Sequence, residues 1–305
     1  MALEDTLAKE RIEYIAKQQA LLETAVSDLQ RTLFEAILIK LEAITKDPTV
    51  LDALFRTFTK DHHLKVINQF ANDIVNVGKR NDAYFKSLLE SDIPKNYTAI
   101  KKQADAYLLK RFGLTEKGAI VEEGFLDSFV KDPTIKRELK AYAYKATQSS
   151  GVGLDAFKKG FKDIIIGSPE ANNGSLQLYY KQWGYDTYQQ VDATIQKFYA
   201  DKLALPAALY LGTKRDGSRE FCLARKGKCF TIEEIKLFGT SKDKYGGYTN
   251  KSEGKFKGKP KTYNPFIDRG GPGCVDALNF VTAKMALRRR DDLELVDGKL
   301  QIKAT

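Results

Sequence analysis

An apolar stripe with the spacing of a helix is the sequence feature that most constrains the fold of this chain. Its members recur every three or four positions, and they are Leu22, Val26, Leu29, Leu33, Ile37, Leu41 and Ile44. This period brings them onto one face of a single long helix. Asp47-Pro48 follows, and proline cannot continue a helix because it lacks the backbone N–H and crowds the preceding turn. The sequence therefore predicts a long helix that is broken at Pro48.

The helical spacing returns in five further segments before residue 205. They cover residues 55–77, 97–114, 134–147, 153–165 and 176–203. We expect the first of these helices to end near Gly78. We expect Gly113 to close the second, because glycine readily adopts the left-handed conformation found at helix C-termini. Residues 1–170 are therefore predicted to form a helical region.

The character of the sequence changes after residue 205. Residues 206–213 and 228–232 are short and apolar, as is typical of strands. Near the C-terminus, alternating residues flank Asp297-Gly298, a dipeptide typical of two-residue hairpin turns. We therefore predict an α+β fold that is mainly α. In it the helical region is followed by a small α+β module, residues 171–305, with short strands and a C-terminal hairpin.

Composition excludes several classes of protein. No apolar run reaches the roughly 20 residues that a membrane-spanning helix needs, and the acidic first residues lack the pattern of a secretory signal. The three cysteines are too few, and odd in number, for a disulfide framework. We therefore expect that the chain is made in a reducing cytoplasm and does not associate with a membrane.

The positive charge of the chain is concentrated in its last third. Residues 201–305 hold 22 Lys and Arg against 13 Asp and Glu, whereas residues 1–200 hold 28 against 27. Within this third, segment 239–262 is rich in glycine and lysine and is expected to form a loop. Its lysines are candidates for contact with DNA or with a protein partner: Lys242, Lys244, Lys251, Lys255, Lys257, Lys259 and Lys261. Such a basic excess favours a polyanionic neighbour.

The cysteines raise the question of metal chemistry. A zinc site would use Cys222, Cys274 and Asp276. Zinc sites usually take ligands from closely spaced pairs, however, and the spacings here are C-x6-C and C-x44-C. The two histidines, His62 and His63, lie far away in a helical segment. We therefore predict no metal, no cofactor and no catalytic residue, and we keep the zinc set as the alternative.

Three basic residues lie beside two of the cysteines. We expect Arg225, Lys226 and Lys228 to lower the pKa of the Cys222 or Cys229 thiol, because nearby cations stabilise a thiolate. A lowered pKa alone does not make a nucleophile, since a catalytic cysteine also needs a base and a group that orients it.

Two blocks of sequence, taken in order, carry a resemblance to a known family. The first is LYLGTKRDGSREFCLARKGKCFTIEEI (209–235), and the second is YNPFIDRGGPGC (263–274). Together they resemble the C-terminal module of the phage Mu F-like minor head proteins, also called phage head morphogenesis proteins, over about residues 175–285. The matching residues are Asp216, Ser218, Arg219, Cys222, Gly227, Lys228, Phe230, Glu233, Glu234, Asn264, Pro265, Arg269, Gly270, Gly271 and Cys274. Where the family pattern has Arg-His after its last cysteine, this chain has Val275-Asp276.

The resemblance implies a structural protein of the virion rather than an enzyme. Such a protein would act in head morphogenesis and in DNA packaging or ejection, in the virion and, during assembly, in the host cytoplasm. Its partners would be the portal or other capsid and neck proteins in a multi-subunit assembly, with packaged double-stranded DNA beside the basic third. The helical region would then be an adaptor. The alternatives are a nonspecific DNA-binding or DNA-processing factor and, less favoured, a metal-dependent enzyme.

The resemblance also assigns roles to individual residues. Cys222 and Cys274 would belong to a fold signature that brings two turns together. Arg219 and Arg269 would be buried side chains that hold these turns, because one guanidinium can satisfy several carbonyls or a carboxylate at once.

Overall fold

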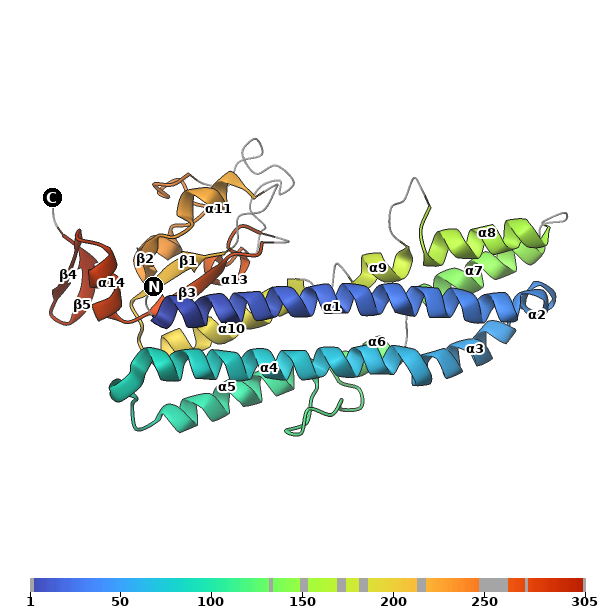
Figure 1. The fold of residues 1–305 in the computed structure, drawn as a ribbon, viewed down its shortest axis with the longest axis horizontal. Helices are drawn as coiled ribbons and strands as arrows, with labels where there is room; N and C mark the ends of the chain where they lie inside the picture. Colours follow the sequence, from blue (N-terminus) through green and yellow to red (C-terminus); the bar gives the residue numbers. More distant parts are fainter. Residues whose placement is uncertain are drawn as a thin grey trace. The chain divides into compact units, whose positions relative to one another are not determined.

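The computed structural model describes residues 3–131, 134–148, 153–168, 174–180, 186–212, 218–246, 263–271 and 274–303. The fold is mainly helical and carries two small antiparallel sheets near the C-terminus (Figure 1). The predicted class, α+β and mainly α, is confirmed. Within the described residues, none of the helices combines the length and the apolar character that a membrane crossing requires.

The first half of the chain is built from long helices. They are α1 (Leu3–Ile39), α2 (Leu41–Lys46), α3 (Val50–Phe58), the π-helical turn η1 (Thr59–His63), α4 (Leu64–Leu89), the 3-10 turn η2 (Glu90–Asp92) and α5 (Tyr97–Phe112). The predicted stripe is buried along α1 and α2, which Lys40 separates. The helix therefore begins well before Leu22, and its last turn precedes Pro48 as expected.

The two glycines expected at helix ends behave differently. Gly113 has φ +64° and follows the last turn of α5, where the Leu114 N–H donates to Leu109 O over 2.8 Å. This prediction is confirmed. Gly78 lies inside α4, so the predicted end there was wrong. A Cβ at Gly78 would lie 3.1 Å from Cδ2 of Leu108, and the glycine therefore serves the close packing of α5 on α4.

The chain divides into two compact units that each take several segments. One contains Met1–Lys17, Ile74–Leu108 and Asp186–Thr305, and the other contains Gln18–Asp73 and Leu109–Tyr185. Helices α1, α4 and α5 each contribute residues to both. The domain boundary expected near residue 170 stays a prediction.

The regular elements in the described part of the second unit are helices, apart from an isolated antiparallel bridge between Leu114 and Ile120. Besides segments of the long helices it contains α6 (Phe125–Lys131), α7 (Thr134–Gln148), α8 (Leu154–Ile165) and α9 (Ser175–Tyr180). Helices α7 and α8 lie side by side (Figure 1). Their contact is aromatic, since the Tyr142 ring lies 5.1 Å from that of Phe161. Asp52 of α3 pairs with Lys136 and Lys140 of α7, at 3.2 and 2.8 Å. The predicted helices 134–147 and 153–165 are confirmed.

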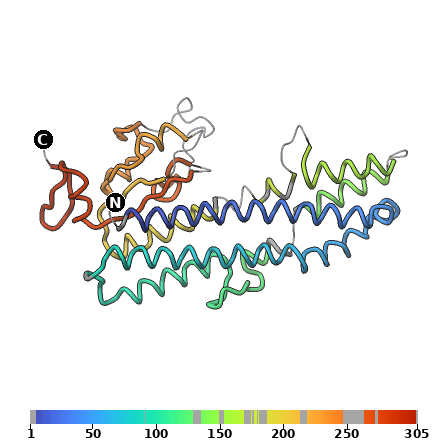
Figure 2. Tube along the Cα trace, viewed as in Figure 1, coloured from blue at the N-terminus to red at the C-terminus, as the bar shows by residue number. Residues whose placement is uncertain are grey.

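The first unit contains the larger sheet. Its strands are β1 (Ala207–Leu211), β2 (Cys229–Thr231) and β3 (Ala277–Val281) in the order β2-β1-β3, both neighbours antiparallel to β1. Leu209 pairs with Cys229 on one side and with Asn279 on the other. Helix α10 (Asp186–Lys202) packs against β3. The same unit contains the short helices α11 (Glu220–Arg225), α12 (Ile232–Lys236), α13 (Pro265–Asp268) and α14 (Ala283–Arg289). Figure 2 traces this path along the chain.

The C-terminal hairpin is formed by β4 (Leu293–Val296) and β5 (Lys299–Ile302). Val296 pairs with Lys299, so Asp297 and Gly298 are the two loop residues. Their φ angles of +50° and +73° are those of the tight turn that matches the twist of the strands. The predicted hairpin is confirmed.

Candidate functional site

Four buried side chains meet at one end of the larger sheet, and we call them the thiol cluster: Tyr210, Cys222, Cys274 and Asp276. The two Sγ atoms lie 3.8 Å apart. The Tyr210 hydroxyl donates to Cys222 Sγ at 3.4 Å and lies 3.9 Å from Cys274 Sγ. Asp276 Oδ2 lies 3.9 Å from Cys274 Sγ. Three stretches of chain that are distant in sequence therefore converge here.

Local structure places each member of the cluster. Tyr210 is a fully buried residue of the central strand β1, and Cys222 lies on the buried face of α11. Gly227 closes the turn after α11 with φ +77°, and its N–H donates to Tyr210 O over 2.8 Å. This bond returns the chain to the edge of β1, where β2 begins.

The turn that carries Cys274 depends on Gly270. A Cβ at this position would lie 2.3 Å from Cys222 Sγ and 3.2 Å from Cys274 Sγ, so that only glycine fits without displacing the sulphurs. Arg219 Nη1 donates to Gly270 O over 2.7 Å, which fixes the turn to the segment before α11. The expectation that the signature brings two turns together agrees with this geometry.

The rest of the second block builds this turn. Asn264 caps α13 by accepting from the Phe266 N–H at 3.1 Å, and Pro265 takes the first helical position, which needs no N–H donor. Arg269 is 2% exposed and has φ +48°, a left-handed conformation that is uncommon for residues other than glycine. Tyr263 holds it by donating its hydroxyl to Arg269 O over 2.8 Å. Arg269 is thus the buried arginine that was expected, whereas Arg219 is only half-buried.

Arg225 is a buried arginine beside the thiol cluster whose burial the sequence did not predict. It is fully buried, pairs with Asp243, and donates to Phe221 O at 2.7 Å. Its guanidinium carbon also lies 3.6 Å from the centroid of the Phe221 ring and 4.6 Å from that of Phe238. The arginine therefore ties α11 to the segment after α12 rather than acting on a thiol.

The pKa values of two cysteines shift in the direction opposite to the one expected. Burial raises the pKa of Cys229 to about 11, although Arg290 and Arg289 oppose the shift. The pKa of Cys222 is also raised, first by its hydrogen bond with Cys274 and then by burial. The prediction that basic neighbours lower these pKa values was wrong. The hydrogen bond with Cys274 is the main cause for the pKa of Cys222, and for Cys229 desolvation of the thiolate outweighs the nearby charges.

Cys274 behaves as the partner of Cys222. Its pKa is lowered to about 6, first by the hydrogen bond from Cys222 and also by the charge of Arg269, while burial opposes both. The two sulphurs therefore act as one group. They give up a first proton readily because the second thiol stabilises the thiolate, and they hold the second proton strongly.

The cluster brings together the three residues of the zinc alternative. One ligand atom from each of Cys222, Cys274 and Asp276 lies within 4.8 Å of the others. The sulphur separation is close to the roughly 3.8 Å edge of a tetrahedral zinc centre with Zn–S bonds of about 2.3 Å. However, Lys226 Nζ lies 3.3 Å from Asp276 Oδ1. This ammonium already neutralises the carboxylate and would repel a cation, so the donor set suits a hydrogen-bonded thiol pair better than a metal centre.

The lysine candidates fall partly outside the described residues. Lys251, Lys255, Lys257, Lys259 and Lys261 lie outside them, as does Asp216 of the first block. Lys242 and Lys244 are exposed, and Lys244 pairs with Glu234 at 3.0 Å.

Comparison with known proteins adds no relative. No protein-family model, no curated protein and no solved structure matches this chain.

Proposed function

We propose that this chain is a minor structural protein of a bacteriophage virion, associated with the head or with the portal and neck, that acts in head morphogenesis and in packaging or ejection of DNA. The observation that carries the proposal is the contact between the two sequence blocks. Gly270 of the second block lies against Cys222 of the first, and Arg219 of the first binds Gly270 O. Blocks of one family pattern are expected to contact each other in the fold, and this contact supports the resemblance.

The basic C-terminal third supports a place beside packaged DNA. Lys and Arg neutralise phosphates and release counterions, and this kind of binding needs no reading of base sequence. The long helices supply extended surfaces for neighbouring subunits, which suits an adaptor in a larger assembly. The chemistry of the thiol cluster supports a structural role, since its cysteines are buried and engaged with each other.

A nonspecific DNA-binding or DNA-processing factor is the second candidate. The excess of Lys and Arg in residues 201–305 favours it equally. The two candidates differ in where the protein is found, because only the first requires stable incorporation into particles.

Quantitative mass spectrometry of particles tests the proposal. Particles are purified from the host that carries this gene in its natural context, before and after DNA ejection. We expect a fixed low copy number per particle, and loss on ejection would identify a protein delivered with the DNA. Absence from particles, together with a soluble fraction that binds duplex DNA, would overturn the proposal in favour of the second candidate.

Incorporation also depends on the signature turn if the proposal is right. A Gly270→Ala variant, supplied to cells that lack the natural gene, should enter particles poorly because the turn no longer closes on Cys222. Gly153→Ala is the matched control, since a Cβ there meets no atom within 4 Å. Equal incorporation of both variants would count against a role for the signature in assembly.

A further inference from the structure

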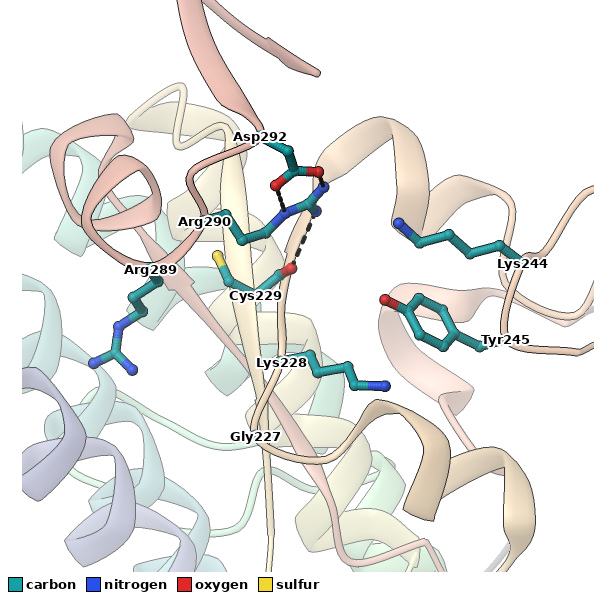
Figure 3. A pocket seen from close by; sticks show the side chains of 8 residues that line it. All are labelled: Gly227, Lys228, Cys229, Lys244, Tyr245, Arg289, Arg290 and Asp292. Carbon is teal, nitrogen blue, oxygen red and sulfur yellow. Dashed lines mark hydrogen bonds and ion pairs between the residues drawn. The ribbon is translucent and has the colours of Figure 1, made fainter. Parts of the chain in front are cut away.

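A cationic pocket lies beside the start of β2, in the C-terminal part of the first unit. Its volume is about 420 Å³, and it is lined by residues from the start of β2 and the turn before it, from the segment after α12, and from the end of α14 and the turn after it. Figure 3 shows its polar members, chiefly Lys228, Lys244, Tyr245, Arg290 and Asp292. A volume of a few hundred Å³ is in the range of small-ligand sites.

Tyr245 is held between two ammonium groups. Lys228 Nζ lies 4.3 Å from the centroid of the Tyr245 ring, and Lys244 Nζ lies 5.2 Å from it. In Figure 3 the ends of both lysines lie on either side of the ring, whose hydroxyl points into the space they enclose. The site therefore presents two positive charges and a hydroxyl donor to one small volume.

The carboxylates around the pocket are already paired with arginine or lysine. Arg290 binds both oxygens of Asp292, at 2.9 and 2.6 Å, and also pairs with Glu234. Lys244 shares Glu234 with Arg290. Lys228 donates to the backbone oxygen of Ala224 at 2.6 Å and has no carboxylate partner among the described residues. An uncompensated positive charge therefore remains at the Lys228 side of the pocket.

This arrangement favours phosphate over carboxylate as the ligand. A carboxylate is best recognised by the planar fork of an arginine, but Arg290 is occupied by Asp292, and Arg289, the other arginine of the lining, donates to Asp5 at 2.7 Å. What remains are lysine ammonium groups, which bind phosphate oxygens as point charges, and a phenol that can donate one more hydrogen bond. We propose that the pocket binds a backbone phosphate of double-stranded DNA, through Lys228, Lys244 and Tyr245. This inference rests on the proposed function for its choice of DNA as the source of the phosphate.

Fluorescence anisotropy of a labelled 30-base-pair duplex with the full chain tests the proposal. We expect the double variant Lys228→Gln/Lys244→Gln to bind about tenfold more weakly at 0.1 M salt, and the magnitude of the slope of log K against log salt to fall by about one, since one phosphate contact is lost. Lys299→Gln/Lys303→Gln, which removes the same charge from the C-terminal hairpin outside the pocket, should retain the wild-type slope. The single variant Lys228→Arg should bind the duplex as tightly as the wild type, because it keeps the positive charge.

Asp292→Asn gives the converse test. It removes the carboxylate that occupies Arg290, so binding of the duplex should tighten several-fold. Unchanged affinity and salt slope in the double variant would overturn the proposal, as would equal losses in the hairpin control.

Competitors separate the sources of the ligand. Millimolar inorganic phosphate or a mononucleotide should compete only weakly with the duplex, because each offers one phosphate where DNA offers many. Full competition by either would overturn DNA as the ligand and indicate a small-anion site. Selective displacement by poly-glutamate would indicate an acidic protein partner and would also overturn it. The binding result is independent of particle composition, so failure here leaves the virion role standing, and absence from particles leaves the binding result standing.

Discussion

Gly270 faces Cys222 so closely that a Cβ on the glycine would lie 2.3 Å from the cysteine Sγ. Gly270→Ala should therefore lower the free energy of unfolding by about 1–3 kcal/mol, the usual cost of overpacking a core. Urea denaturation followed by circular dichroism measures the change. A Gly270→Ala/Cys222→Ala double variant should recover part of the loss, since removal of the sulphur makes room for the methyl group, and the coupling energy should be on the order of 1 kcal/mol. Strict additivity of the two substitutions would contradict this explanation.

The Arg225 and Asp243 ion pair is buried, and its loss should be costly. Arg225→Met should lower the free energy of unfolding by about 3–5 kcal/mol, because Asp243 would keep its charge without its main partner. Arg31→Met is the matched control, since Arg31 pairs with Asp28 in solvent and such pairs contribute little. Denaturation midpoints of both variants decide the question. If Arg225→Met changes the free energy of unfolding by less than about 1 kcal/mol, the ion pair with Asp243 and the contacts of Arg225 with aromatic rings are not needed for stability.

The sequence predicts the local features of this fold well and its long-range features poorly. The helices follow from a period that is visible in the sequence, and the hairpin follows from Asp297-Gly298, because both depend on neighbouring residues. Strand β3 was missed, since ALNFV (277–281) is a short buried run without alternation, which periodicity cannot assign. Gly78 was assigned to a helix end because a glycine that serves helix packing has the same sequence signature as one that closes a helix.

In the candidate site, too, the local features could be predicted from the sequence and the long-range contacts could not. The participation of Gly270 was expected only from the resemblance, whereas Cys222 and Cys274 were also grouped by the zinc alternative. The distances among the three residues depend on the fold. Arg225 was assigned to thiol chemistry because its acceptor Asp243 and its aromatic neighbours reach it only in the folded chain. Lys228 entered only as a thiol neighbour and a family match, since its relation to Tyr245 is equally non-local.

His63 should make stability depend on pH. It is buried beside Tyr180, and burial lowers its pKa to about 4 from an ordinary value of about 6.5. Between these values the unfolded chain binds a proton that the folded chain does not, so the free energy of unfolding should fall as pH falls from about 6.5 toward 4. The slope contributed by this one group approaches about 1.4 kcal/mol per pH unit.

Urea denaturation at several pH values measures this slope. His63→Leu should flatten the dependence between pH 4 and 6.5, because the titrating group is gone. The exposed neighbour His62 provides the control, and His62→Gln should leave the dependence as in the wild type. An unchanged slope in His63→Leu would assign the pH dependence to other groups.

Cys229 should resist alkylation in the folded protein. The pKa of Cys229 is raised to about 11, chiefly by burial, so that at pH 8 its thiolate fraction should be about 100-fold below that of a thiol with pKa 9. Labelling with iodoacetamide, read by peptide mass spectrometry, should therefore modify Cys229 far more slowly in the native protein than in urea. Lys228→Gln should leave the rate unchanged, because desolvation and not the neighbouring ammonium sets the pKa of this thiol. Rapid labelling of native Cys229, slowed by Lys228→Gln, would show instead that the basic neighbours activate it.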